Sequence, residues 1–332
     1  MNIAIIGCGT MGMTYAYNLG KMPGVNVSGT ADLLKERAQD AASASGGKAY
    51  TDWEQMLDAE SPETVAVCVP TYLHKEFVIK LARRGIHIIC EKPAALTLED
   101  AREMKQICEE QGVRLFIGHV VRFFPSYADA IHKVRSGKIG TAQMAHFKRH
   151  GSYPQGSELW YHDPAKSGGV IMDLMIHDID YACWLFGDVE SVYASVTDPS
   201  ISGIEYAQIT LKFQSGAIAN LTGFWGYPGP FTTQFEITGD QGLIRYDSNQ
   251  VQSLDLKTLA GLSKSQDAVQ VPSSPALHDP YYGEVKHFIE CIQSGEEPIV
   301  SISDACRAVE VALACKQSAQ TGQPVPMGGT AS

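Results

Sequence analysis

Over roughly the first 120 residues, short apolar runs rich in β-branched side chains alternate with longer segments of helical period. The strands expected from these runs are 2–6, 25–31, 64–69, 86–90 and 113–117, and the helices expected between them are 11–20, 33–45, 73–84 and 97–111. Most of the runs are apolar at almost every position, which is the pattern of a strand covered on both faces. This part of the chain is therefore predicted to be an α/β domain in which helices cover both faces of a doubly wound parallel sheet.

The pattern changes after about residue 125, where polar and apolar positions mix within each run. The strands expected here are 141–149, 189–197, 204–213, 216–225 and 231–238, the helices are 126–136, 172–186, 280–294 and 303–319, and a surface loop is expected at 263–279. Such strands indicate a large, open, mainly antiparallel sheet with one covered face. Because 332 residues exceed one ordinary domain, we expect a first domain at 1–122 and a second α/β domain at 123–332, whose C-terminal helix can pack back on the first.

The net charge and the cysteines limit which partners the protein is expected to bind and in which compartment it is expected to occur. The chain carries 37 acidic and 26 basic residues, a formal charge of −11, which repels phosphate backbones and anionic lipid. No run approaches the ~18 apolar residues of a membrane span. The eight cysteines form no CxxC pair, which is typical of reduced thiols. We therefore expect a cytoplasmic protein that binds neither nucleic acid nor membrane.

The motif Gly7-Cys8-Gly9-Thr10-Met11-Gly12 follows the first apolar run and opens the first helical segment. Glycines at this spacing allow a tight turn and let a pyrophosphate approach the backbone N–H groups of a helix N-terminus. Asp32, at the end of the second run, can accept hydrogen bonds from both ribose hydroxyls of an adenosine and would repel a 2′-phosphate. We expect NAD as cofactor in preference to NADP. A packing turn at the glycines and a helix N-cap at Asp32 are the alternatives.

A second motif, Glu91-Lys92-Pro93, stands at the carboxyl end of the run 86–90. In an open parallel sheet the carboxyl ends of the strands are where ligands bind. A lysine there can donate to a substrate oxygen, and the proline after it restricts its backbone to an extended conformation. Taken as a tripeptide, the motif is equally typical of a surface Lys–Glu pair before a proline turn.

These two motifs and the run Ser167-Gly-Gly-Val-Ile-Met-Asp-Leu-Met-Ile-His-Asp-Ile-Asp180 together resemble the Gfo/Idh/MocA family, the family of glucose-fructose oxidoreductase and inositol dehydrogenase. The likeness spans nearly the whole chain in the same order. It implies a Rossmann domain, followed by an α/β domain whose open sheet forms a homodimer or homotetramer interface. It also implies NAD(P)-dependent oxidation or reduction at a carbon of a sugar or cyclitol.

The resemblance assigns catalytic positions to Lys92, Asp173 and His177. Asp173 and His177 are spaced i, i+4 in a predicted helix, so both side chains would lie on one face. Hydride leaves a carbinol carbon as the hydroxyl proton is removed, and histidine is the usual base for this near neutral pH. Lys92 can stabilise the developing alkoxide or hold the hydroxyl. A core histidine is the alternative for His177.

Further contacts are assigned by position along the family pattern, from which the chain departs at His119 and Val121, where polar residues are replaced. Cofactor contacts are expected at Val69, Thr71, His74, Glu91, Lys92 and Arg122, and substrate contacts at Lys92, His119, Trp160, Tyr161, Asp173 and His177. His74 could instead simply begin a helix, and Trp160 or Tyr161 could belong to the core. No metal is expected, because residues 177, 178 and 180 do not all face one cation on a helix.

Three functions are open at this point. The first is an NAD-dependent dehydrogenase acting on a secondary alcohol of a sugar, sugar derivative or inositol. The second is a redox-neutral NAD-dependent glycosidase or lyase that oxidises its substrate transiently with the same residues. The third is a dinucleotide-binding sensor or transcriptional co-regulator without turnover. Such sensors tend to lose the lysine or histidine that this chain keeps as Lys92 and His177.

Overall fold

The computed structural model describes residues 1–154, 157–197, 204–250, 255–258 and 279–328. Most of the loop expected at 263–279 therefore lies outside the described residues. The chain divides into two compact units. Unit 1 comprises Met1–Phe123, Ser157–Ser167 and His278–Val309, and unit 2 comprises Phe124–Gly156, Gly168–Leu277 and Glu310–Ser332.

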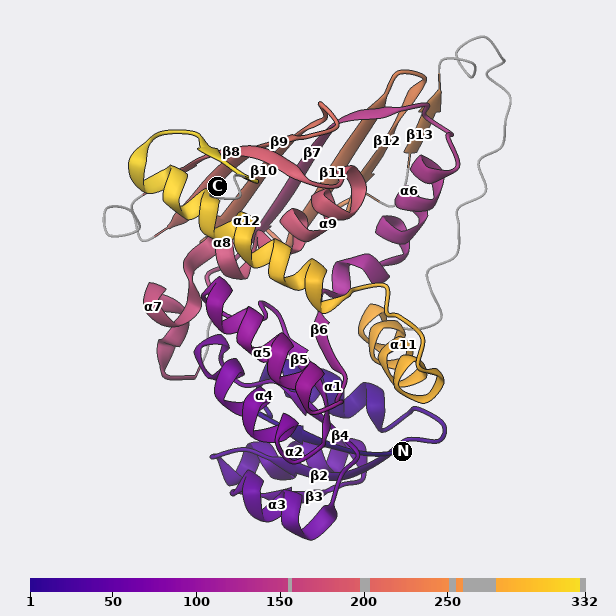
Figure 1. Ribbon diagram of the computed structural model, residues 1–332, viewed down its shortest axis with the longest axis vertical. Coiled ribbons are helices and arrows are strands. Elements are labelled where there is room, and N and C mark those ends of the chain that lie inside the picture. The colour runs from indigo at the N-terminus through magenta and orange to yellow at the C-terminus, as the bar shows by residue number, and fades with distance from the viewer. Residues whose placement is uncertain (155–156, 198–203, 251–254, 259–278, 329–332) are drawn as a thin grey trace. The chain divides into compact units, whose positions relative to one another are not determined.

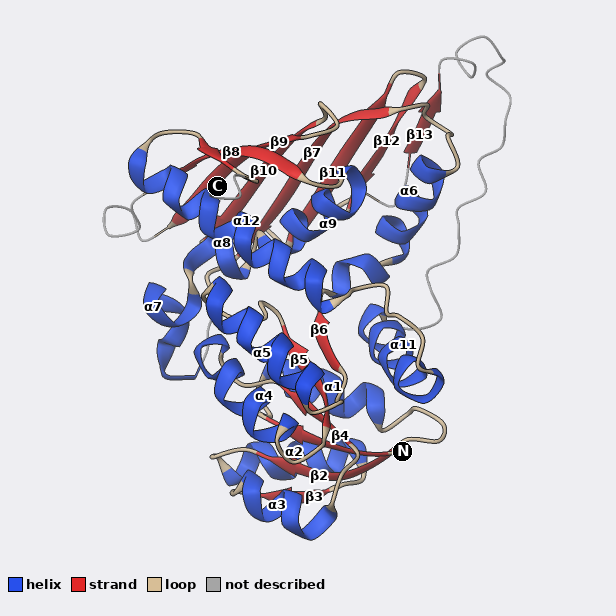
Figure 2. Cartoon of the chain, viewed as in Figure 1, coloured by secondary structure: helices blue, strands red, loops and turns tan. Residues whose placement is uncertain are grey.

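Unit 1 is built on a six-stranded parallel sheet with the strand order β3-β2-β1-β4-β5-β6, which is the order of a Rossmann fold. Its strands are β1 (Asn2–Ile6), β2 (Asn26–Ala31), β3 (Lys48–Tyr50), β4 (Thr64–Val67), β5 (His87–Glu91) and β6 (Leu115–Gly118). Its helices and 3₁₀ turns are α1 (Thr10–Leu19), α2 (Lys35–Ser45), α3 (Trp53–Glu60), η1 (Thr71–Leu73), α4 (His74–Ala82), α5 (Leu98–Glu110), η2 (Val120–Phe123), η3 (Ser157–His162), α7 (Pro164–Ser167) and α11 (Pro280–Ser294). The predicted parallel sheet is confirmed (Figures 1 and 2).

Two elements of unit 1 are absent from the sequence prediction. β3 has three residues, none of them buried, and therefore lacks the apolar run that marks the other strands. The short helix α3 begins after Asp52, whose carboxylate accepts hydrogen bonds from the N–H groups of Glu54 and Gln55. Both elements lie at the β3 edge of the sheet, away from the strands that carry the motifs.

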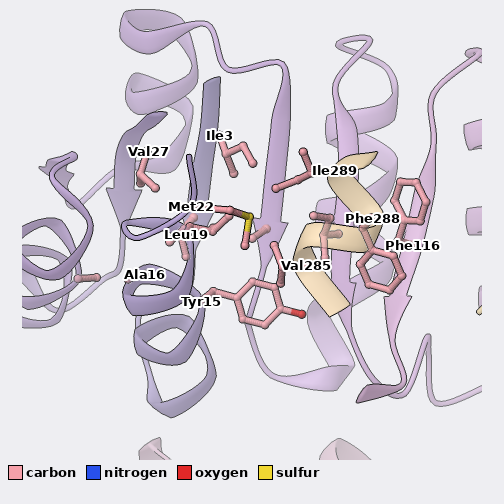
Figure 3. Close-up of a cluster of buried hydrophobic side chains, with 14 of the residues drawn as sticks. Ile3, Tyr15, Ala16, Leu19, Met22, Val27, Phe116, Val285, Phe288 and Ile289 are labelled. Atoms are coloured by element: carbon pink, nitrogen blue, oxygen red, sulfur yellow. The ribbon is translucent and has the colours of Figure 1, made fainter. Parts of the chain in front are cut away.

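The core of unit 1 joins segments that are far apart in the sequence. Tyr15 and Leu19 of α1 are buried in one cluster with Phe116 of β6 and with Val285 and Phe288 of α11 (Figure 3). The rings of Phe116 and Phe288 stack with their centroids 4.9 Å apart. Burying a side chain of this size contributes roughly 1.5–3 kcal/mol. Helix α11, which comes late in the chain, is thus part of the Rossmann core.

Unit 2 is built on an eight-stranded sheet with the order β13-β12-β11-β7-β10-β9-β8-β14. Its strands are β7 (Ala142–Gly151), β8 (Val189–Val196), β9 (Glu205–Phe213), β10 (Ile218–Trp225), β11 (Thr232–Gly239), β12 (Gly242–Asp247), β13 (Asp255–Thr258) and β14 (Val325–Pro326), and its helices are α6 (Pro125–Arg135), α8 (Gly169–Asp173) and α9 (Ile176–Phe186). Helix α12 (Ile302–Thr321) begins in unit 1 and ends in unit 2. Among the strand pairs of the described residues, all are antiparallel except β7 with β10. The mainly antiparallel sheet is therefore confirmed, while β12 to β14 extend it beyond the predicted strands.

One expected helix of unit 2 is broken in the structure. The segment predicted as a single helix at 172–186 forms α8 and α9, which a turn at Leu174–Met175 separates. The N–H groups of Leu174 and Met175 both donate to the carbonyl oxygen of Val170, which closes the turn. The expectation that Asp173 and His177 share one continuous helix is therefore wrong. Asp173 ends α8, and His177 stands in the first turn of α9.

Candidate functional site

The glycines of the first motif differ in what surrounds them. A Cβ on Gly7 would lie 2.7 Å from the Cys68 backbone, and a Cβ on Gly12 would lie 1.9 Å from the Gly7 carbonyl oxygen. Around the corresponding position of Gly9, the described part of the chain places nothing within 4 Å. Gly9 is the N-cap of α1. Gly7 and Gly12 are thus required by close packing, and Gly9 leaves room for a phosphate at a helix N-terminus.

Asp32 links this turn to the end of β2. Its Oδ2 atom accepts a hydrogen bond of 2.8 Å from the Cys8 N–H, and its Oδ1 atom accepts one of 2.9 Å from the Leu34 N–H. The N-cap of α2 is Leu34, so Asp32 is not the cap of that helix. A carboxylate oxygen has two acceptor sites, and each oxygen of Asp32 therefore retains capacity for a ribose hydroxyl.

The two middle residues of the turn begin α1. Thr10 is exposed, and its carbonyl oxygen accepts from the Thr14 hydroxyl. Met11 is half-buried against the core cluster of unit 1. The two side chains face different surroundings. Both residues, however, have their backbone at the N-terminal end of α1.

The second motif lies where β5 ends. Glu91 is the last residue of β5 and is 6% exposed, Lys92 is half-buried, and the Lys92–Pro93 peptide bond is cis. The Lys92 N–H donates to Oε2 of Glu91 over 3.2 Å. Since the glutamate is buried, the interpretation of the motif as a surface Lys–Glu pair is wrong. The structure instead holds Lys92 at the carboxyl edge of the parallel sheet.

His74 fixes the loop that carries Lys92. Its Nδ1 atom lies 2.8 Å from the Pro93 carbonyl oxygen and its Nε2 atom 3.0 Å from that of Val69. The ring is 1% exposed, and burial lowers the pKa of His74. A neutral imidazole donates through one of its two nitrogens. The ring therefore joins the loops that follow β4 and β5.

Three other predicted contact residues of unit 1 are deeply buried. Arg122 donates from Nη1 to the Ile299 carbonyl oxygen at 2.8 Å and forms an ion pair with Asp304 at 3.4 Å. His119 is 0% exposed and Thr71 is 4% exposed. Arg122 thus binds the segment that follows α11, which belongs to the same unit, through a hydrogen bond and an ion pair.

The aromatic pair expected on the substrate side also belongs to unit 1. The rings of Trp160 and Tyr161 stack with their centroids 3.9 Å apart, and both residues are half-buried. In the same segment, Lys166 Nζ lies 5.5 Å from the ring centroid of Tyr72, which follows the Val69 loop. Neither aromatic residue is a fully buried core side chain.

In unit 2, two glycines lead into the segment that carries Asp173 and His177. Gly168 and Gly169 both have a φ of +78°, a conformation that favours glycine. The Gly168 carbonyl oxygen accepts from Lys316 Nζ at 2.9 Å, and the Val170 N–H donates to Glu205 Oε1 at 2.8 Å. Burial raises the pKa of Glu205 and lowers that of Lys316. These two residues were missed in the sequence because they stand in distant segments without a motif.

Asp173 and His177 differ in exposure. Asp173 is 8% exposed at the end of α8, and His177 is half-buried. The next residue, Asp178, forms a buried bidentate ion pair with Arg149 at 2.9 and 2.8 Å. No group of three or more histidine, cysteine, aspartate or glutamate residues able to hold a metal occurs in the described ranges. The Asp178 carboxylate is therefore part of a buried ion pair inside unit 2.

The chain belongs to the Gfo/Idh/MocA oxidoreductase family. The model of that family's NAD-binding Rossmann fold matches residues 1–119, and the model of its C-terminal alpha/beta domain matches residues 131–327. The resemblance that the motifs carry is confirmed, and unit 1 holds an NAD-binding Rossmann domain. Within the described residues, no helix is both long and apolar enough to cross a membrane.

Individual relatives span the whole chain or part of it. The scyllo-inositol 2-dehydrogenase (NAD(+)) of Bacillus subtilis is 30% identical, over 98% of this chain and 95% of that protein. The 2,7-anhydro-N-acetylneuraminate hydratase of Mediterraneibacter gnavus is 35% identical over 55% of this chain and 49% of that protein. The crystal structure of myo-inositol 2-dehydrogenase from Lactobacillus plantarum is 25% identical, with a TM-score of 0.82 and 99% of both chains covered.

The three glycines should separate folding from cofactor binding. Gly9→Val places a side chain in open space at the start of α1, so we expect Tm to stay near wild type and NAD affinity to fall about tenfold or more. Gly12→Ala forces a Cβ against the Gly7 carbonyl and should lower Tm. Gly283→Ala, at a helical site with nothing within 4 Å in the described chain, is the control: it should leave NAD affinity unchanged and should not lower Tm, because alanine is the better helix former. Unaltered NAD titration by Gly9→Val would contradict this assignment.

His74 should make stability depend on pH. Because burial holds the pKa of His74 below its ordinary value of 6.5, the unfolded chain binds this proton first and the folded state loses stability as the pH falls below about 6.5. We expect the decrease in Tm between about pH 7 and about pH 5 to be smaller by ~2 °C or more in His74→Gln. The exposed His132 supplies the control His132→Gln, which should keep the wild-type slope. Equal slopes in both variants would rule out this linkage.

Proposed function

We propose that the protein is an NAD-dependent dehydrogenase that oxidises a secondary alcohol of a sugar, sugar derivative or inositol. The observation that carries this proposal is the placement of Lys92 at the carboxyl edge of the sheet that also presents the glycine turn and Asp32. The names of the full-length relatives, an NAD-dependent scyllo-inositol dehydrogenase and a myo-inositol dehydrogenase, support the same substrate class.

The residues of unit 1 fit the dinucleotide. The space in front of Gly9 and the N–H groups at the start of α1 would hold its pyrophosphate, and Asp32 would hold its adenosine ribose. When bound, NAD supplies a hydride acceptor. Asp32 would also repel a 2′-phosphate, so we propose NAD in preference to NADP.

Lys92 and His177 divide the work on the substrate hydroxyl. The Lys92 ammonium donates to the hydroxyl oxygen and stabilises the negative charge that develops there. His177 accepts the hydroxyl proton as the carbon is oxidised. Asp173, at the end of α8, accepts a hydrogen bond from the substrate or orients His177. Trp160 and Tyr161 offer aromatic surface on which an apolar sugar face can stack.

A redox-neutral reaction is the second candidate. It is favoured by the partial match to a relative named as a hydratase. In such a reaction bound NAD would supply a transient hydride acceptor and would return to its starting state, while the same residues move the hydroxyl proton and a neighbouring C–O bond breaks. The two candidates differ in net redox change, since the dehydrogenase accumulates NADH and the redox-neutral enzyme does not.

The protein is further proposed to act in the cytoplasm as a homodimer or homotetramer formed through the open sheet of unit 2. Met144, Tyr193 and Ile218 are between 36% and 45% exposed, and Ile218 pairs with Met144 in adjacent strands. Apolar side chains on one open face favour burial against a second copy. Light scattering should give a multiple of the chain mass, and Ile218→Lys should reduce it.

Loss of either proposed catalytic side chain should abolish turnover without abolishing cofactor binding. We expect Lys92→Ala and His177→Ala each to lower kcat by about 10²–10⁴-fold, because each removes a proton-transfer or charge-stabilising group. NAD titration should be unchanged, since neither side chain belongs to the glycine turn. Lys138→Ala, at an exposed position, is the control. Wild-type kcat in either catalytic variant would overturn its assignment.

Asp32 should set the choice of dinucleotide. We expect Asp32→Ala to weaken NAD binding about tenfold and to narrow the preference for NAD over NADP. Asp40→Ala removes one exposed negative charge from α2 and should leave the ratio as it is. If Asp32→Ala keeps the wild-type ratio, the carboxylate holds the turn and does not select the cofactor.

The test of the proposed function is a screen of purified protein with NAD against sugars, sugar acids and inositols. NADH absorbance and product analysis by mass spectrometry are read together. A compound oxidised with NADH accumulation supports the dehydrogenase, and conversion without NADH supports the redox-neutral enzyme. NAD binding with no conversion of any compound supports the sensor.

A further inference from the structure

A buried carboxylic acid lies on α11 in unit 1. Glu284 of α11 is 0% exposed, and neither of its carboxyl oxygens has a hydrogen-bond partner among the described residues. An ionised carboxylate without partners in an apolar core costs several kcal/mol. The side chain is one that neither the sequence motifs nor the proposed chemistry uses, and its retention in the core calls for an explanation.

Glu284 faces a small polar cluster formed by two other elements of unit 1. Glu91 of β5 acts on Glu284 electrostatically, and both carboxyls act on the Tyr15 phenol of α1. In Figure 3 the Tyr15 hydroxyl points toward the α11 ribbon that carries Val285 and Phe288. Three elements that are distant in the sequence thus bring two carboxyls and a phenol together.

Gly118 shows how closely two of these groups converge. A Cβ built on Gly118, the last residue of β6, would lie 3.2 Å from both Glu91 Oε1 and the Tyr15 hydroxyl. The other oxygen of the same carboxylate, Glu91 Oε2, accepts the Lys92 N–H. Glu91 therefore has one oxygen in the cluster and one on the backbone of Lys92.

Burial and neighbouring charge keep three groups of the cluster protonated, and one of them is a carboxyl that can donate a hydrogen bond. Burial, and next the negative charge of Glu91, raise the pKa of Glu284 well above its ordinary value. Burial likewise raises the pKa of Tyr15 and of Cys68, which also faces the two carboxyls from the loop after β4. With these three groups protonated, Glu284 is a neutral acid with one O–H to donate, and the Glu91 carboxyl that acts on it offers acceptor oxygens in the same cluster.

We propose that Glu284 is a positioning residue that remains protonated, donates its O–H to Glu91, and so fixes the carboxylate that holds Lys92. The proposal rests on the role of Lys92 in the proposed function. It adds a requirement that lies in α11, nearly 200 residues beyond the Glu-Lys-Pro motif. The positioning of Lys92 requires a neutral hydrogen-bond donor at position 284, and a negative charge at that position would disturb it.

Two substitutions separate the donor from the shape. Glu284→Gln keeps the length and a neutral donor, and Glu284→Met keeps the bulk without a donor. We expect kcat to stay within about threefold of wild type in the Gln variant and to fall about tenfold or more in the Met variant. KM for NAD should be unchanged in both. Equal kcat in the Gln and Met variants, whether wild-type or reduced, would overturn the proposal.

A second readout needs no substrate. Since the pKa of Glu284 is raised in the folded state, the unfolded chain ionises first as the pH rises above about 4.5, and wild-type stability falls until the folded pKa is reached. Glu91, Tyr15 and Cys68 are unchanged in Glu284→Gln, so its Tm advantage over wild type should grow by ~2 °C or more between about pH 5 and about pH 8. A constant difference would overturn the proposal even if Glu284→Met fails to fold.

A third readout reports on Lys92 itself. The rate at which an amine-specific reagent labels Lys92 is followed by peptide mass spectrometry in wild type and both variants, with the exposed Lys138 as internal control. We expect Glu284→Met to change the Lys92 rate at least about threefold, while Glu284→Gln and Lys138 remain unchanged. An unaltered Lys92 rate in Glu284→Met contradicts the positioning role. Absence of turnover in wild type, with these two readouts as expected, contradicts the proposed function alone.

Discussion

The close approach of α1 to β1 is the constraint on which the rest of unit 1 depends. A Cβ at Gly12 would lie 1.9 Å from the Gly7 carbonyl oxygen and a Cβ at Gly7 would lie 2.7 Å from the Cys68 backbone, so the turn from β1 into α1 requires glycine at both positions. That turn places Tyr15 and Leu19 in the core with α11, and it leaves the N–H groups of α1 open beside Gly9. Packing and the anion site thus arise from the same turn.

In each unit, buried polar groups support the residues that are proposed to be catalytic. His74 joins two loop carbonyls, Glu91 holds the Lys92 N–H, and Arg149 neutralises Asp178 beside His177. Each of these groups loses hydration on folding, which is offset only if its partners are correctly placed. Burial therefore makes the Lys92 loop and the first turn of α9, which carries His177, sensitive to the loss of side chains that touch no substrate.

The sequence predicts the parts of this molecule whose signal is local. The strands β1, β2, β4, β5 and β6 follow from their apolar runs, and the glycine turn and the Lys92 motif follow from spacing within a few residues. The three-residue strand β3 has no such run, and the turn after Asp173 depends on hydrogen bonds to Val170 that periodicity does not reveal. Glu205 and Glu284 escape prediction because each is a lone acidic residue, defined only by what the fold places beside it. The family resemblance places His74 among the expected cofactor contacts. Its role as a link between two loops is seen only from the two carbonyl oxygens that its ring contacts.

The single parallel pair in the sheet of unit 2, β7 with β10, has a consequence for how the protein folds. Parallel neighbours need a long crossover, and here the intervening chain contains α8, α9, β8 and β9, with Asp173 and His177 among its residues. Pairing strands so distant in sequence is slow, because the loop must close before the contacts form. The middle of the sheet is therefore expected to assemble late, and the segment that carries His177 is enclosed between the two strands only at that stage. A nascent chain that has not passed β10 lacks this enclosure, so the proposed base is acquired only when the sheet is completed.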